Sequence, residues 1–216
     1  MRVWDSELLT QNGENMPVTD GLLVSLDALD FIDHTTNFTD RITGNIIVPN
    51  DTKIHRITRV DNVLSVDCIK TTSGQTKIDF SSVQELVGVK CVDFTFKSAN
   101  SNVIDGRIRF GEYNNSVIDC GIYNNNYLTF DGIMHHYTIC MDGSSLYVYT
   151  DGALSQTVSN SKVPYNTYTF LTTYCAYREI KHLYDLGSLR VYSTPLSVDQ
   201  ILKNHQYEIS VGRLSV

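Results

Sequence analysis

The sequence has few cationic side chains for its length. Its 216 residues hold 17 Lys and Arg against 24 Asp and Glu, a formal net charge of −7 at pH 7. Nucleic acids and anionic membrane surfaces attract clustered positive charge, so this balance disfavours both as partners. The densest basic stretch, residues 53–59, alternates along a strand-like segment and is interpreted as one solvated strand face.

Long apolar runs and targeting signals are also missing. No apolar run reaches membrane-spanning length, and the chain does not open with a charged segment, an apolar stretch and a small-residue cleavage site. We therefore expect no membrane insertion, a mature chain that starts at Met1, and folding in a reducing cytoplasm. With 42% hydrophobic residues, 19% charged residues and only 4 Pro, the chain has a globular composition rather than a disordered one.

Cysteine is sparse and widely spaced. The chain has 5 cysteines, at positions 68, 91, 120, 140 and 175. An odd number at wide spacing argues against both a disulfide framework and a zinc site. Each lies in a strand-like apolar segment, so we expect small buried apolar residues with reduced thiols.

Short alternating segments dominate what is present. Residues 135–159 form the strongest pattern, in which Asp-Gly turns at 142–143 and 151–152 separate three strands of a meander. Residues 91–97 alternate cleanly, with Val92, Phe94 and Phe96 on one face. Further strands are expected at 21–27, 48–60, 63–70, 77–80, 104–110, 116–123, 127–130 and 168–175, with the 77–80 strand ending near 81–82. Many short strands at this spacing favour an antiparallel β-sandwich.

The C-terminal stretch 185–208 combines a strand, a turn and a helix. The strand ends at residues 193–195, Ser-Thr-Pro. Ser197 then has the position of a helix N-cap, and Asp199 adds negative charge to the first turn. Apolar residues recur at helical spacing from Val198 to Tyr207, which predicts one short helix.

Two of these stretches resemble a known superfamily. The segment 135–159, with its His-His start and two Asp-Gly turns, and the segment 185–208 resemble laminin G-like modules of the concanavalin A-like lectin and glucanase superfamily, found in phage virion and bacterial surface proteins. The resemblance implies an all-β, antiparallel jelly-roll β-sandwich with a short C-terminal helix. It divides the chain into an N-terminal arm or attachment segment, 1–20, and a laminin G-like domain, 21–216.

Catalytic motifs are absent. Related sandwiches that cleave glycans need paired carboxylates on one strand, but Asp67 and Asp93 each stand alone in their strands. His135 and His136 are adjacent on a strand and point to opposite faces, so they cannot jointly bind a metal. The sequence has no Gly-rich phosphate loop or nucleophile elbow either. We therefore predict that the chain is not an enzyme.

Tyrosine is the residue that suggests a binding site. Aromatic rings pack on the C–H face of sugars, while Asn and Asp bond their hydroxyls. Tyr residues flank two Asn clusters and lie near a second rim of the sandwich, so the predicted carbohydrate-binding residues are Tyr113, Tyr123, Asn125, Tyr127, Tyr174 and Tyr177. The alternative is that these are ordinary strand tyrosines whose hydroxyls reach solvent.

Calcium is a further prediction. The superfamily often holds Ca²⁺ in rim loops through Asp, Asn and backbone oxygens, which suit a hard cation. Here the candidate ligands are Asp27, Asp30 and Asp185. Polar loops contain such residues without a metal as well.

The sequence thus leads to a functional hypothesis. We expect the protein to be a non-enzymatic carbohydrate-binding module of a virion, which attaches to a bacterial surface glycan and contacts other virion proteins through residues 1–20. One alternative is a structural decoration or fibre subunit of a phage particle with protein contacts only. A glycoside hydrolase is less favoured, and a homo-oligomer is left open.

Overall fold

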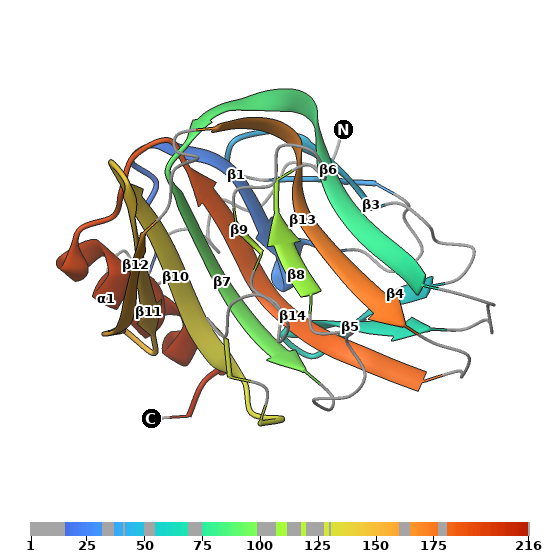
Figure 1. The fold of residues 1–216 in the computed structure, drawn as a ribbon. Helices are drawn as coiled ribbons and strands as arrows, with labels where there is room; N and C mark the ends of the chain where they lie inside the picture. The colour runs from blue at the N-terminus through green and yellow to red at the C-terminus, as the bar shows by residue number, and fades with distance from the viewer. Residues whose placement is uncertain are drawn as a thin grey trace, which may run out of the picture.

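Two antiparallel sheets pack face to face in the protein (Figure 1). The structure, a computed structural model, describes residues 16–31, 37–40, 42–49, 55–68, 75–98, 107–111, 118–119, 128–129, 131–159, 165–176 and 181–215. None of the helices in this part of the chain is long and apolar enough to cross a membrane. The predicted all-β, antiparallel jelly-roll sandwich with a short C-terminal helix is confirmed.

The larger sheet, sheet A, has the order β12-β11-β10-β7-β14-β5-β4. β1 pairs with the second half of β14, beside the stretch that pairs with β5. Its strands are β1 (Leu22–Asp27), β4 (His55–Val60), β5 (Val63–Cys68), β7 (Cys91–Ser98), β10 (His135–Asp142), β11 (Ser145–Thr150), β12 (Ala153–Ser159) and β14 (Lys181–Tyr192).

The smaller sheet, sheet B, has the order β2-β3-β6-β13-β8-β9. Its long central pair β6 and β13 curves over one end of the sandwich (Figure 1). Its strands are β2 (Phe38–Thr39), β3 (Ile46–Pro49), β6 (Gln75–Val89), β8 (Arg107–Phe110), β9 (Ile118–Asp119) and β13 (Tyr165–Ala176).

The apolar core lies between the sheets. Val92, Phe94 and Phe96 of β7 are buried in it, as their alternation predicted, and β7 lies in the middle of sheet A. Phe80 and Phe110 of sheet B are buried in the same core, and the ring centroids of Phe94 and Phe110 are 4.9 Å apart. Residues at the alternate positions of each strand therefore face away from the core.

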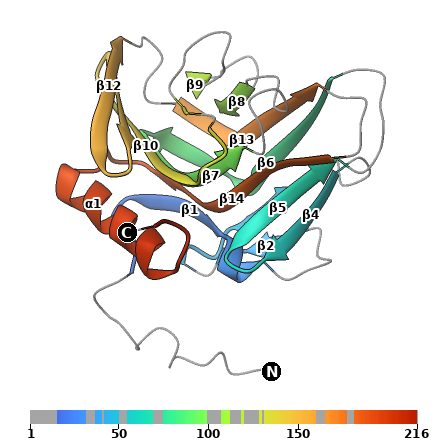
Figure 2. The same cartoon turned by 90° about the horizontal axis from the view of Figure 1, so that it is seen from below.

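Helix α1 (Val198–Ser210) covers the outer face of sheet A. Ser197 caps it as predicted: the Ser197 hydroxyl accepts from Gln200 N–H while the Gln200 side chain accepts from Ser197 N–H. This reciprocal capping box satisfies two backbone donors that the first turn would otherwise leave free. Figure 2 shows α1 on the side of β1, β14 and β10 that is turned away from sheet B.

Some predicted strand boundaries were wrong. The strand expected to end near residues 81–82 continues as β6 to Val89, because shifts in its pairing with β13 let both strands bend without breaking. Residues 128–129, within the strand expected at 127–130, are not in a strand. The meander of residues 135–159 is confirmed as β10, β11 and β12.

Gly152 in the β11–β12 turn combines a left-handed backbone with a close neighbour. Its φ is +81°, and a Cβ atom there would lie 2.9 Å from Leu202 Cδ2 of α1. We expect Gly152→Ala to lower the free energy of unfolding by more than about 1 kcal/mol. Gly143 in the β10–β11 turn, with φ +56° and nothing within 4 Å of such a Cβ, is the matched control. Urea unfolding of both variants checks this, and equal losses would contradict a contribution from the α1 contact.

Candidate functional site

The outer face of sheet A carries a network of charged side chains beneath α1. Asp93 on β7 and Arg190 on β14 are cross-strand partners in the backbone register. Arg190 and Glu208 of α1 are fully buried, as is Asp93. Isolated charges are costly to bury, so the sequence can place these residues here only because they neutralise one another.

The contacts form one chain from the sheet to the C-terminus. Arg190 Nη1 donates to Asp93 Oδ2 at 3.1 Å, and its Nη2 donates to Glu208 Oε1 at 2.7 Å. Arg213 Nη1 donates to Glu208 Oε2 at 2.9 Å, while its Nη2 donates to Asp27 Oδ1. Asp27 Oδ2 also accepts from the Tyr207 hydroxyl at 3.0 Å. The helix and the segment after it are thereby tied to β1, β7 and β14.

His136 extends the network along β10. Its Nε2 lies 2.8 Å from Asp93 Oδ1, which also accepts from the Thr138 hydroxyl at 2.8 Å. Burial opposes ionisation of Asp93, but the His136 and Arg190 charges outweigh it and lower the pKa of Asp93. In the same way, Arg190 and Arg213 hold the pKa of Glu208 far below its usual range despite burial. The network is closed to solvent, so we interpret it as a structural clamp.

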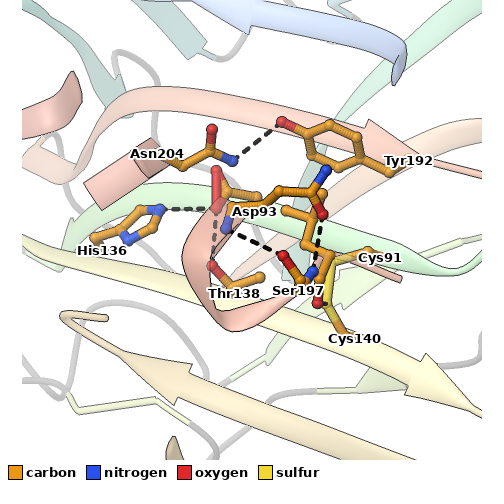
Figure 3. The surroundings of a disulfide bond; sticks show 10 residues. Cys91, Asp93, His136, Thr138, Cys140, Tyr192, Ser197 and Asn204 are labelled. Atoms are coloured by element: carbon orange, nitrogen blue, oxygen red, sulfur yellow. Dashed lines mark hydrogen bonds and ion pairs between the residues drawn. A yellow bond between two sulfur atoms is a disulfide. The ribbon is translucent and has the colours of Figure 1, made fainter. Parts of the chain in front are cut away.

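A disulfide lies at one end of this clamp. Cys91 and Cys140 are cross-strand partners on β7 and β10, and they are disulfide-bonded (Figure 3). The prediction of reduced thiols was therefore wrong for this pair. The two residues are 49 positions apart in sequence, and only the pairing of β7 with β10 brings them together. Leu196 and Ile201 cover them in a small second core.

The end of the predicted N-terminal arm contacts the same region. Val18 is buried, its N–H donates to Asn204 Oδ1 at 2.8 Å, and its carbonyl accepts from the Tyr192 hydroxyl at 3.1 Å. Asn204 Nδ2 in turn donates to the Tyr192 oxygen at 3.1 Å, which Figure 3 shows beside Asp93. Residue 18 is thus fastened to α1, whereas residues 1–15 lie outside the described part of the chain.

The predicted calcium ligands are engaged in different places. Asp27 belongs to the buried clamp, Asp30 is half-buried in a short 3-10 helix (Ala28–Asp30), and Asp185 lies on β14. Asp185 Oδ2 is 3.5 Å from Lys97 Nζ, and its Oδ1 is 3.2 Å from His182 Nε2. Across the described residues no group of three or more His, Cys, Asp or Glu is arranged to hold a metal ion. The calcium site stays a prediction.

The two adjacent histidines face opposite ways, as the strand period predicted. His136 is buried against Asp93, while His135 has a partly exposed side chain between two turn carboxylates. His135 Nδ1 is 2.7 Å from Asp151 Oδ2, and its Nε2 is 3.1 Å from Asp131 Oδ2. Burial lowers the pKa of His135, but these two carboxylates outweigh it and raise the pKa overall. The pair thus carries structural contacts, as expected.

Sheet B presents a different polar group on its outer face. Asp79 on β6, Thr172 on β13 and Arg109 on β8 form one row across the three strands, because Thr172 is the register partner of both others. All three are buried, at 5%, 5% and 8% exposure, and the Thr172 hydroxyl donates to Asp79 Oδ1 at 2.7 Å. Their chain neighbours Phe80, Leu171 and Phe110 belong to the core, so the row faces outward. The sequence does not display this row, because each member stands alone in its own strand.

Tyr174 lies one row further along β13. Its register partners are Lys77 on β6 and Arg107 on β8. Of the six predicted carbohydrate-binding residues, Tyr174 is the one that lies within the described part of the chain. The other predicted residues lie outside the described part: Tyr113, Tyr123, Asn125, Tyr127 and Tyr177.

Comparison with known proteins bears on the fold. No family model and no curated protein matches the chain. Among solved structures, the sialidase of Trypanosoma rangeli in complex with sialic acid aligns with a TM-score of 0.57 at 13% identity, over 90% of this chain and 34% of that one. A botulinum neurotoxin type C structure, described with the dependence of cell entry on two ganglioside molecules, aligns with a TM-score of 0.56 at 10% identity, over 89% and 52%.

A third match is the binding domain of botulinum neurotoxin DC in complex with rat synaptotagmin II. It aligns with a TM-score of 0.54 at 11% identity, over 89% of this chain and 52% of that one. The chain thus spans about a third of the sialidase and half of the neurotoxin chains. Identities this low show the fold alone. The protein shares the β-sandwich fold of these structures.

Proposed function

We propose that the chain is a non-catalytic carbohydrate-binding module whose site lies on the outer face of sheet B. The row of Asp79, Thr172 and Arg109 is the observation that carries this proposal. Because the three side chains are almost closed to solvent and Thr172 bonds Asp79, the row would act by holding the residues beside it in place rather than by contacting a sugar directly. Buried polar groups of this kind make a rigid, pre-organised floor.

The position of Tyr174 supports the same face. It follows Thr172 by two residues on β13 and belongs to the next row. An aromatic residue in the row next to polar side chains is a combination that sugar recognition uses. That the fold neighbours include a sialidase and neurotoxin structures described with sialic acid and gangliosides agrees with a glycan ligand.

The finer proposal is that the module is part of a phage virion and binds a bacterial surface glycan. Its support is the resemblance of residues 135–159 and 185–208 to virion modules. Residues 1–15 would then contact other virion proteins. Labelling of purified particles with antibodies against the chain tests this step, and particles without label would contradict it.

A glycan array with the purified chain tests the binding proposal. We expect binding to at least one glycan class, and a loss of affinity of at least about tenfold for Tyr174→Ala, because truncating an aromatic anchor removes much of a site's binding energy. Thr172→Val, which removes the hydroxyl that bonds Asp79, should weaken the same glycans. Repeating the array with a chelator shows whether calcium takes part.

Tyr168→Ala is the matched control on the same strand. Tyr168 is 49% exposed and lies on β13 six residues before Tyr174, so its removal should leave glycan affinity unchanged. Equal effects of the two tyrosine variants would move the site away from the polar row. An array without any binding would refute the module as proposed and favour a structural subunit with protein contacts only.

A further inference from the structure

The clamp beneath α1 accommodates one additional positive charge. Three carboxylates face two guanidiniums in it, those of Asp27, Asp93, Glu208, Arg190 and Arg213. The fully ionised set therefore has one unbalanced negative charge. A protonated His136, with Nε2 2.8 Å from Asp93 Oδ1, balances it. The cluster thus favours the imidazolium form of His136.

His205 on α1 is the neighbour of His136 across the helix–sheet interface. The two ring centroids are 5.5 Å apart, with an angle of 33° between the planes. The Nδ1 atoms of both rings are buried and have no hydrogen-bond partner within the described structure. The ideal Cβ position of Gly152 lies 3.6 Å from His205 Cδ2. His205 is thus close to both the β11–β12 turn and the His136 ring.

Asp151, Glu208 and Asp93 favour a proton on His205 through their charge, but each of these carboxylates is already bonded to other groups. Asp93 and Glu208 are both committed to the clamp. Asp151, in the β11–β12 turn, accepts from His136 N–H through Oδ1 at 2.9 Å and lies 2.7 Å from His135 Nδ1 through Oδ2. The second proton therefore produces two like charges at close range.

The pKa directions agree with this geometry. Burial lowers the pKa of His136, but the Asp93 charge and hydrogen bond outweigh it, so the pKa is raised above 6.5. Burial and then the His136 charge lower the pKa of His205 below 6.5. His136 therefore stabilises the docked helix below pH 6.5 and loses that contribution as the pH rises through its raised pKa. His205 costs stability as the pH falls from 6.5 through its lowered pKa, because the released helix binds that proton more readily.

We propose that His136 and His205 form a pH-sensitive latch, in which protonation of His205 loosens α1 from sheet A and releases the N-terminal segment fastened to it. The link to the N-terminus is Asn204, the residue before His205. Its side chain accepts from Val18 N–H at 2.8 Å and donates to the Tyr192 oxygen that in turn bonds the Val18 carbonyl. Movement of the helix breaks the two hydrogen bonds of Asn204, to Val18 and to Tyr192, at once.

Hydrogen–deuterium exchange of the full chain at pH 7.0 and pH 5.5, corrected for intrinsic exchange rates, tests the latch. We expect protection of residues 198–210 and of the Val18 amide to fall at the lower pH, by at most about tenfold, because pH 5.5 lies one unit below the ordinary histidine pKa of 6.5. Protection of β6 and β13 should remain. His205→Gln should remove the loss of protection at pH 5.5, because glutamine does not titrate, and leave only the opposite, stabilising effect of His136 protonation.

His182→Gln is the control for the general loss of a histidine. His182 lies on β14 between Asp67 and Asp185, away from α1, so this variant should keep the full pH dependence of the helix. The same loss of protection in His205→Gln as in the unmodified chain would overturn the latch. Unchanged protection of α1 at pH 5.5, or an equal loss in both sheets, would overturn it too.

Discussion

Glu208→Gln is expected to lower the free energy of unfolding by about 3–5 kcal/mol, the usual cost of removing one partner from a buried ion pair. The Glu208 carboxylate accepts from Arg190, Arg213 and the Ser188 hydroxyl, and all of its surroundings are buried. A neutral amide leaves two buried guanidiniums with less negative charge than they need. Urea unfolding followed by circular dichroism measures the loss.

Glu85→Gln is the matched control for this change. Glu85 is exposed on β6 of the other sheet, and removing its charge should alter the free energy of unfolding by less than about 0.5 kcal/mol. Because the pKa of Glu208 is depressed, its stabilising contribution is present above pH 4.5 and is lost as the pH falls through the depressed value. A Glu208→Gln chain as stable as the control would contradict the clamp.

Reduction of the Cys91–Cys140 disulfide is expected to cost about 2–4 kcal/mol of stability, since the bond closes a long loop in the unfolded chain. The Cys91→Ala, Cys140→Ala double variant should show a similar loss. Its stability should then be insensitive to reducing agent, whereas that of the unmodified chain falls. Peptide mapping without reduction should recover the two cysteines as one cross-linked pair.

Free thiols at both positions under oxidising conditions would contradict this expectation. The bond also bears on where the chain folds, because disulfides persist in oxidising surroundings and are rare where thiols are kept reduced. The expectation of folding in a reducing cytoplasm rested on the absence of a targeting signal and on the spacing of the cysteines. The disulfide and the expectation are compatible if the bond forms after folding. Comparing the thiol content of cell extracts with that of the purified chain shows whether the bond is already present in the cell.

Local patterns carried most of the fold. Strand alternation in residues 91–97 identified the core face of β7, the two Asp-Gly turns identified the β10–β12 meander, and Ser197 marked the start of α1. Each of these depends on neighbours within a few positions, which a sequence displays directly. The course of β6 was harder, because Ser81 and Ser82 are typical of turns and only pairing with β13 on one side and β3 on the other keeps the strand going.

The candidate sites could mostly not be predicted from the sequence, because their residues are far apart along the chain. Asp79, Thr172 and Arg109 come from three strands and become a row only through the register of sheet B. The sequence did suggest Tyr174 through its tyrosine-rich surroundings, but not the polar row beside it. One signal was available: isolated charged residues within apolar strands, such as Arg190 in LRVY, indicate a buried partner.

The sequence by itself determined the fold class, the order of the strands in the meander, the short terminal helix and the opposite orientation of His135 and His136. Only the tertiary structure decided that the polar face of β7 is covered rather than solvated. Strand periodicity separates two faces but does not say what packs on each. That depends on α1 folding back from the end of the chain, where Glu208 neutralises Arg190 and brings His205 beside His136.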